Sequence, residues 1–211
     1  MIKVEGGTFQ MGQEGVATPV HSVTLSGYYI GETEVTQTMW QAVMGSNPSE
    51  FKGDNLPVEM VSWDDCQEFI RKLNQMTGKT FALPTEAQWE YAARGGNKSR
   101  GYEYSGSNSV GDVAWYYDNS SSQTHQVGTK QANELGLYDM SGNVREWCAD
   151  WYGSYSSTSQ TDPTGPSTGS SRVLRGGSWR FSARRCRSAD RYSFNPDYRY
   201  IYYGFRLVLL F

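Results

Sequence analysis

The sequence has few cysteines and histidines, and this scarcity excludes several kinds of site. Its 211 residues include three cysteines, Cys66, Cys148 and Cys186, and two histidines, His21 and His125. An odd number of widely spaced cysteines is neither a disulfide framework nor a zinc motif. Two distant histidines exclude a histidine-rich metal site and leave few members for a Ser-His-Asp or Cys-His arrangement.

Positive charge and long apolar runs are also missing. The net charge is −3, so nothing indicates a nucleic-acid partner or an anionic membrane surface. No run approaches the ~20 apolar residues of a membrane span. The first residues lack the basic start and apolar stretch of a signal peptide, although a chain trimmed of its export signal would look the same. No heptad pattern or large apolar patch favours assembly, so we expect a monomer.

The chain is instead rich in glycine and large aromatic residues. It contains 23 glycines, 15 tyrosines and 7 tryptophans, while hydrophobic residues make up only 37%. This composition is typical of a protein with many turns and loops and a core built from aromatic rings. The length suits one domain.

Strands and helices are predicted within the first 96 residues, and further strands near the end of the chain. Alternating apolar residues predict strands within 6–12 and 21–35. Helices are expected within 36–45, 62–79 and 84–96, with N-caps at Thr36, Ser62 and Thr85 and glycines at their ends. Glycine- and serine-rich loops follow, and apolar strands at 172–177 and 207–211 flank a polar, aromatic tail. Helices followed by loops and strands favour an α+β fold.

Seven stretches, in order, resemble the formylglycine-generating-enzyme-type domain, also called the sulfatase-modifying factor domain. They are "GGTFQMG", "YYIGETEVTQTMW", "PVEMVSWDDC", "LPTEAQWEYAARGG", "GLYDMSGNVREW", "LRGGSW" and "GFRL". The resemblance covers nearly the whole chain. It implies a single domain over residues 1–211, with a C-type-lectin-like α+β fold of two main helices, short strands and long loops.

The resemblance also implies a catalytic centre that this sequence does not complete. The enzymes of the family oxidise a substrate cysteine with a pair of cysteines that bind copper(I), soon after the "GGS" motif. Here that segment is "GGSWRFSARRCRSADR", and Cys186 is its only cysteine. We therefore expect no enzyme activity and no required cofactor. The related iron-dependent sulfoxide synthases need a histidine cluster that this chain lacks.

The tail resembles the variable region of proteins that retroelements diversify by replacing adenines in a template. The expected variable region is 179–206. Its fixed positions, here called the frame set, would be Trp179, Ala183, Cys186, Arg187, Ser188, Ala189, Arg191, Pro196, Arg199, Gly204, Phe205 and Arg206. Its variable positions, the contact set, would be Arg180, Phe181, Ser182, Arg184, Arg185, Asp190, Tyr192, Ser193, Phe194, Asn195, Asp197, Tyr198, Tyr200, Ile201, Tyr202 and Tyr203.

The alphabet of the contact set agrees with adenine replacement. Changing the adenines of an asparagine codon that ends in C or U never gives Lys, Glu, Gln, Met or Trp, and the set contains none of them. Tyrosine and arginine offer large contacts and versatile hydrogen bonds for binding. We expect Arg187, Arg191 and Arg199 of the frame set to hold loops through hydrogen bonds to carbonyls or carboxylates. The alternative for each tyrosine is a place in the core.

One metal site follows from the family resemblance. Asp139, Gly142, Val144 and Glu146 match the positions where the family's enzymes bind structural calcium through side-chain and carbonyl oxygens. The alternative is that Asp139 and Glu146 brace the loop.

The sequence therefore predicts a non-enzymatic binding protein with a diversified surface for an unknown protein or surface ligand. A copper-dependent formylglycine-generating oxidase and an accessory lectin-like domain without diversification are the alternatives. The resemblance implies display at the cell surface or outside the cell, with a lipid anchor as one route.

Overall fold

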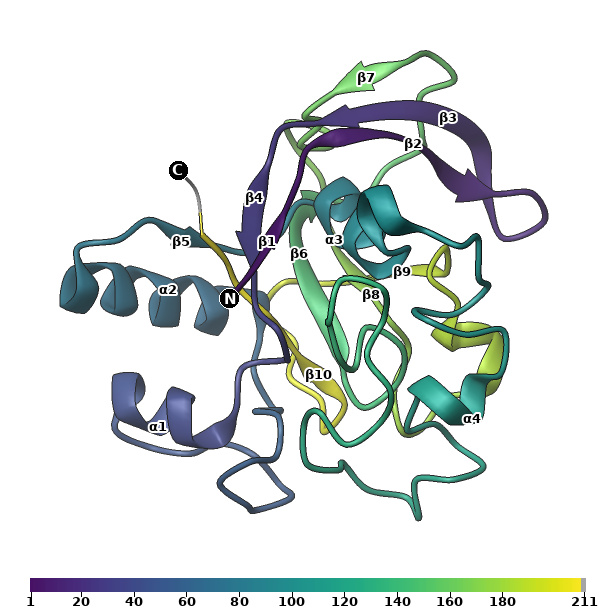
Figure 1. Cartoon of the computed structure of the whole chain (residues 1–211). Helices are drawn as coiled ribbons and strands as arrows, with labels where there is room; N and C mark the ends of the chain where they lie inside the picture. The colour runs from purple at the N-terminus through teal and green to yellow at the C-terminus, as the bar shows by residue number, and fades with distance from the viewer. Residues whose placement is uncertain (210–211) are drawn as a thin grey trace.

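The computed structural model describes residues 1–209, which form a mixed α+β fold of short strands, helices and long loops (Figure 1). Within these residues the strands form three small sheets, ordered β1-β4-β11-β5, β10-β6-β8-β9 and β2-β3-β7. The strands are β1 (Ile2–Val4), β2 (Gly7–Gln13), β3 (Ala17–Leu25), β4 (Tyr28–Ile30), β5 (Phe81–Ala82), β6 (Arg145–Trp151), β7 (Gln160–Thr161), β8 (Arg172–Arg175), β9 (Arg191–Phe194), β10 (Tyr203–Gly204) and β11 (Val208–Leu209). The helices are α1 (Gln37–Met44), α2 (Trp63–Thr77), α3 (Glu86–Ala93), α4 (Val110–Val113) and the 3₁₀ turns η1 (Gly96–Lys98) and η2 (Ala183–Cys186).

The three longest helices begin where their capping residues predict. Thr36 accepts a hydrogen bond from the Met39 amide at the start of α1. Ser62 and Thr85 form reciprocal capping boxes at the starts of α2 and α3. Such caps satisfy amides that have no partner inside the helix. The helix predictions are therefore confirmed.

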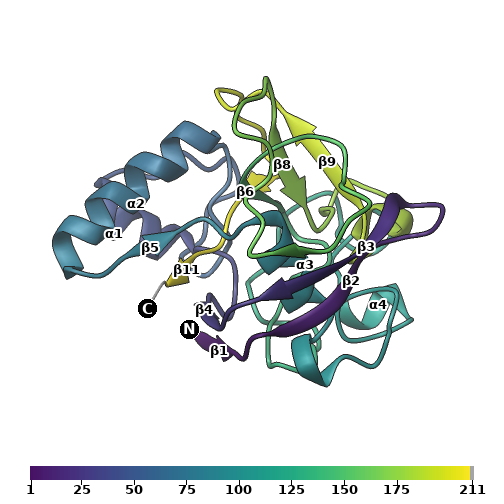
Figure 2. The same cartoon turned by 90° about the horizontal axis from the view of Figure 1, so that it is seen from above.

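Strand β4 joins the two ends of the described chain. It pairs antiparallel with β1 on one side and with β11 on the other. Figure 2 shows these strands beside the α1 and α2 pair, with β8 and β9 in a separate layer. The predicted strand at 207–211 is confirmed at Val208–Leu209, and its last two residues lie outside the described part of the chain.

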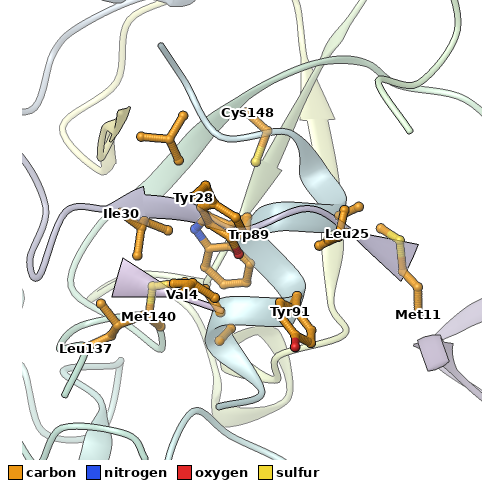
Figure 3. Close-up of a cluster of buried hydrophobic side chains, with 14 of the residues drawn as sticks. Val4, Met11, Leu25, Tyr28, Ile30, Trp89, Tyr91, Leu137, Met140 and Cys148 are labelled. Carbon is orange, nitrogen blue, oxygen red and sulfur yellow. The ribbon is translucent and has the colours of Figure 1, made fainter. Parts of the chain in front are cut away.

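Large aromatic residues fill the interior in two main apolar clusters. In one, Trp89 and Tyr91 of α3 pack with Tyr28 of β4 and with apolar residues of β1 and β3 (Figure 3). In the other, Trp40 stacks on Phe69 with ring centroids 5.2 Å apart, joining α1 to α2. The second cluster extends to β6, β8 and β10, which hold the tail.

The tail after β8 is more regular than the sequence predicts. Strand β9 pairs antiparallel with β8 in the register Arg175↔Arg191 and Arg172↔Phe194, and β10 runs parallel to β6. Between β8 and β9 the chain makes the short turn η2. Gly176 and Gly177 there adopt φ values of +91° and +72°, which a side chain would disfavour. The contact set therefore lies on and around η2, on β9, on the turn that leads to β10 and, with Tyr203, on β10 itself.

Candidate ligand-binding surface

The contact set separates into three groups by exposure. Its exposed members are Arg180, Ser182, Arg184, Tyr192, Asn195, Asp197 and Tyr198. Its half-buried members are Phe181, Arg185, Ser193, Phe194, Tyr200, Ile201 and Tyr202, and its buried members are Asp190 and Tyr203. Most of the set can therefore be reached by a ligand.

The frame set shows the opposite distribution. Only Arg199 is exposed. The buried members are Trp179, Cys186, Ser188, Ala189, Gly204, Phe205 and Arg206, and the half-buried ones are Ala183, Arg187, Arg191 and Pro196. The frame set is thus mostly buried and the contact set mostly accessible. The residue types alone do not reveal this difference.

Tyr203 is a correction to the contact set. Its side chain is 2% exposed and packs edge-on against Trp147 of β6, with ring centroids 5.3 Å apart. Its position in β10, beside β6, directs it into the core. Asp190 is also buried, and its carboxylate lies 3.3 Å from Arg185 and 3.9 Å from Arg145. Neither residue offers a ligand the open surface that we expected.

Five aromatic side chains of the contact set form an almost closed circle. Ring centroids lie 5.3 Å apart for Phe181 and Tyr202, 5.1 Å for Tyr202 and Tyr200, and 5.8 Å for Tyr200 and Phe194. Tyr192 continues the series at 6.3 Å from Phe194. We call these five residues the aromatic circle. They present the edges and faces of rigid rings, the chemistry that dominates binding hot spots.

Hydrogen bonds to backbone carbonyls hold the segment that carries these rings. The carbonyl of Pro196 accepts from the Trp63 amide at 2.9 Å, and that of Tyr200 from the Met60 amide at 3.0 Å. Two further carbonyls of the turn are held in the same way. Ile201 accepts from Nε1 of Trp179 at 3.1 Å, and Tyr202 accepts from the Arg145 amide at 2.8 Å. None of these donors belongs to the contact set, and none of the bonds uses a contact side chain.

The arginines of the frame set pair with carboxylates from other parts of the chain. Arg191 makes two hydrogen bonds of 2.8 and 2.6 Å to Glu86, and Arg199 makes two of 2.6 and 2.7 Å to Asp65. Arg187 lies 2.6 Å from Glu103. The expected bracing role is confirmed for Arg191 and Arg199, whereas Arg187 forms an ion pair with Glu103 but its Nε has no hydrogen-bond partner among residues 1–209.

Arg145 completes the circle and was missed by sequence reasoning. Its guanidinium carbon lies 4.2 Å from the ring centres of both Phe181 and Tyr192. The side chain is 2% exposed, and its Nη1 has no hydrogen-bond partner within residues 1–209. Burial lowers the pKa of this guanidinium. In the sequence, Arg145 stands out only as part of the family-like stretch "GLYDMSGNVREW", and that resemblance does not indicate a contact with the tail.

The three cysteines lie in separate parts of the interior. Cys148 belongs to the α3 cluster, Cys66 to the α1–α2 cluster, and Cys186 to a small cluster near α4. All three are free and buried. Burial raises the pKa of the Cys186 thiol to about 12 and raises those of the other two well above the usual range. The chain therefore provides neither a cysteine pair nor a ready thiolate for copper.

Two of the four expected calcium ligands, Glu146 and Asp139, already accept hydrogen bonds in this arrangement. Both oxygens of Glu146 accept hydrogen bonds of 2.7 Å from Arg206, and one also accepts from Trp89. Asp139 uses one oxygen for the Gly128 amide and leaves the other without a partner among the described residues. Residues 1–209 hold no cluster of three histidine, cysteine or acidic side chains suited to a metal. A calcium ion would first have to displace Arg206, which favours the alternative that Asp139 and Glu146 brace the loop and leaves calcium binding to be decided by experiment.

Comparison with known proteins identifies close relatives. The family described as "Sulfatase-modifying factor enzyme 1-like domain" matches residues 1–210. The "Chaperone protein LppX" of Paenibacillus barcinonensis is 37% identical, over 85% of this chain and 78% of that protein. The "Formylglycine-generating enzyme" of Streptomyces coelicolor is 32% identical, over 97% of this chain and 87% of the enzyme.

A solved structure matches the fold closely. "Treponema denticola variable protein 1" superposes with a TM-score of 0.94 at 37% identity, covering 99% of this chain and 94% of that one. The C-type-lectin-like α+β fold and the resemblance to a variable protein are thereby confirmed. Within residues 1–209, no helix is long and apolar enough to cross a bilayer.

Proposed function

The chain belongs to the sulfatase-modifying factor enzyme 1-like family, and within that family we propose that it is a non-enzymatic binding protein. Its ligand site would be the surface formed by the aromatic circle and the exposed members of the contact set. The region 179–206 would be the variable part of a single domain. The likeness to a protein named as a variable protein supports this assignment.

One observation carries the proposal: donors outside the contact set hold the carbonyls of the tail, while among the contact side chains Asn195 accepts only a long bond of 3.4 Å from the Asp197 amide. Carbonyls of the tail accept hydrogen bonds from Trp63, Met60, Trp179 and Arg145, while frame arginines pair with distant carboxylates. Replacing an exposed side chain removes none of these bonds. Such a surface can vary its contacts and keep its geometry, which reduces the entropy cost of binding.

A comparison of coding sequences tests the diversification. We expect a near-copy of the segment encoding residues 179–206 close to the gene, beside a reverse transcriptase. The two copies should differ only where the near-copy has adenine, and the differences should fall on the contact set. A locus without such a copy, or with differences spread over frame codons, would refute diversification.

A copper assay distinguishes the proposed binding protein from the alternative, a copper-dependent oxidase. Because the cysteines are buried in three different clusters, we expect no stoichiometric copper(I) binding and no oxidation of a cysteine-containing peptide. The Streptomyces coelicolor enzyme is a suitable positive control. Tight copper(I) binding with peptide turnover would make the chain an enzyme.

We also infer display at the cell surface or outside the cell, because a variable binding site is useful only where it meets foreign or partner surfaces. Protease shaving of intact cells tests this location. Loss of the protein without loss of a cytoplasmic marker is expected, and full protection from the protease would contradict it.

A further inference from the structure

A small cleft beside the aromatic circle is lined mainly by arginine. It has a volume of about 160 Å³ and lies between the turn after β2, at Gly15 and Val16, and the η2 turn. The charged residues that line it are Arg184, Arg185, Arg187 and Asp190. At roughly 30 Å³ per water, the cleft has room for one small charged group and its hydration.

Positive charge in and behind this cleft is incompletely balanced. Arg187 pairs with Glu103, and Arg185 approaches Asp190 at 3.3 Å. Arg184 is exposed and has no ion-pair partner within residues 1–209. Arg145 lies behind Asp190, with its Nη2 3.9 Å from the carboxylate. Four guanidinium groups therefore face two carboxylates, so two positive charges are left uncompensated.

The ion pairs of Asp190 are also longer than other arginine–carboxylate pairs in this protein. Arg206 and Arg199 hold their carboxylates at 2.6 to 2.7 Å with two hydrogen bonds each. Among residues 1–209, the Asp190 carboxylate accepts one hydrogen bond, at 3.3 Å, from Arg185. Its longer contact with Arg145 leaves Nη1 of that buried guanidinium without a partner among residues 1–209. Arg145 does not line the cleft, but its positive charge is weakly balanced at 3.9 Å from Asp190 and would attract a second carboxylate bound in the cleft.

We propose that this arginine cleft binds a side-chain carboxylate of an acidic peptide segment in the ligand. The inference rests on the proposed binding function and gives its ligand a chemical class. Arg184 and Arg185 would donate to the incoming carboxylate, and Arg145 would add attraction from beneath. Asp190 already shows that a carboxylate is accommodated here, because it occupies the space between Arg185 and Arg145.

The cleft is placed so that one ligand can touch it and the aromatic circle together. Arg145 is packed against Phe181 and Tyr192 of the circle and faces Asp190 of the cleft. The guanidinium carbon of Arg180, which is exposed, lies 5.7 Å from the ring centre of Tyr202 in the circle. An acidic segment with apolar or aromatic neighbours would complement this combination of charge and rings.

Titration of the full chain with fluorescein-labelled hexaglutamate tests the cleft, using fluorescence anisotropy at low salt. We expect saturable binding that is lost with hexaglutamine and at about 1 M salt, where the Debye length is about 3 Å. The double variant Arg184→Gln with Arg185→Gln should bind at least about tenfold more weakly, because two charge-assisted donors are lost. Arg71→Gln on α2 removes an exposed charge far from the cleft in sequence and should change the affinity less than about twofold.

A second variant changes binding in the opposite direction. Asp190→Asn removes the internal competitor and should tighten hexaglutamate binding severalfold. Absence of saturable binding to the wild-type chain, equal weakening by Arg71→Gln, or no tightening by Asp190→Asn would overturn the inference. Displacement of the peptide by equimolar pyrophosphate would assign the cleft to phosphate groups and also overturn it.

The two proposals fail separately. If the adenine-specific near-copy is found and hexaglutamate does not bind, the arginine cleft alone is wrong. If the near-copy is absent, diversification is wrong whatever the peptide does.

Discussion

At the scale of single residues, neighbouring tyrosines in the tail have different surroundings. Tyr198 is 48% exposed and contacts the rings of Phe194 and Tyr200 at the surface. Tyr203 is 2% exposed and packs against Trp147 and three rings of the circle from below. A ring at the surface is available for binding, whereas the buried ring supports the surface from the core.

Replacing these two rings should therefore have unequal effects on stability. We expect Tyr203→Ala to lower the free energy of unfolding by about 3–5 kcal/mol, because it removes a packed ring and leaves a cavity. Tyr198→Ala should cost less than about 1 kcal/mol. Urea unfolding of the two variants measures the difference, and equal losses would place both rings in the same environment.

Asp150 gives a second residue-scale prediction, through pH. Burial raises its pKa to about 7, and the nearby Glu86 adds to the shift. An unfolded aspartate loses its proton near pH 4, so between about pH 4 and 7 only the folded state keeps the proton. The contribution of Asp150 to the unfolding free energy is therefore intact below about pH 4 and falls as pH rises to about 7.

The variant Asp150→Asn should lose less unfolding free energy than the wild type as pH rises. Urea unfolding at about pH 5 and about pH 8 would show a smaller difference than in the wild type, by on the order of 3 kcal/mol or less. Glu59, with a pKa raised by burial to about 7, would retain its own share of the slope. An unchanged slope in the variant would mean that Asp150 is ionised throughout.

At the scale of elements, the start of α2 is also an anchor for the tail. Asp65 accepts from the Ser62 amide as part of the capping box and binds Arg199 through both oxygens. The Trp63 amide meanwhile donates to the carbonyl of Pro196. One turn of helix thus fixes both a frame side chain and the backbone of the tail.

Replacing Asp65 should loosen the start of α2 and the turn of the tail together. We expect Asp65→Ala to cost about 1–2 kcal/mol, since it removes a cap contact and a partly exposed ion pair. Hydrogen exchange at the amides of residues 63 and 66 and in the turn 195–200 should accelerate. The neighbouring Asp64→Ala is the control, because Asp64 is exposed and outside the capping box. Faster exchange confined to α2 would show that the tail does not depend on this anchor.

These elements also show which features a sequence can predict. The caps at Thr36, Ser62 and Thr85 are local chemistry within three or four residues, so the helix ends were predicted correctly. The partnership of Arg191 with Glu86 spans 105 positions, and no spacing rule connects them. The same holds for Arg145 and the rings of Phe181 and Tyr192, and for the inward position of Tyr203 in β10. Which of the adjacent Tyr202 and Tyr203 is buried depends on the pairing of β10 with β6, which the sequence does not reveal.

At the scale of the whole molecule, buried ion pairs tie the tail to the rest of the chain. Glu146 of β6 bonds to Arg206, which also donates to the carbonyls of Gly31 and Tyr138. This arrangement satisfies the carboxylate that calcium would need. We therefore expect the melting temperature to be the same in calcium and in EDTA. A rise with calcium that Asp139→Asn abolishes would show that the ion displaces Arg206.

The central claim is that a fixed frame carries replaceable contacts, and a library measures it most directly. All positions of the contact set except Asp190 and Tyr203 would be randomised in one library, and all positions of the frame set in a second. Folded clones of each would be selected by protease resistance and sequenced. The account predicts that the contact positions accept many residues and that the frame positions return to the native ones. Equal tolerance in the two libraries, or a return to the native tyrosines of the aromatic circle, would contradict it.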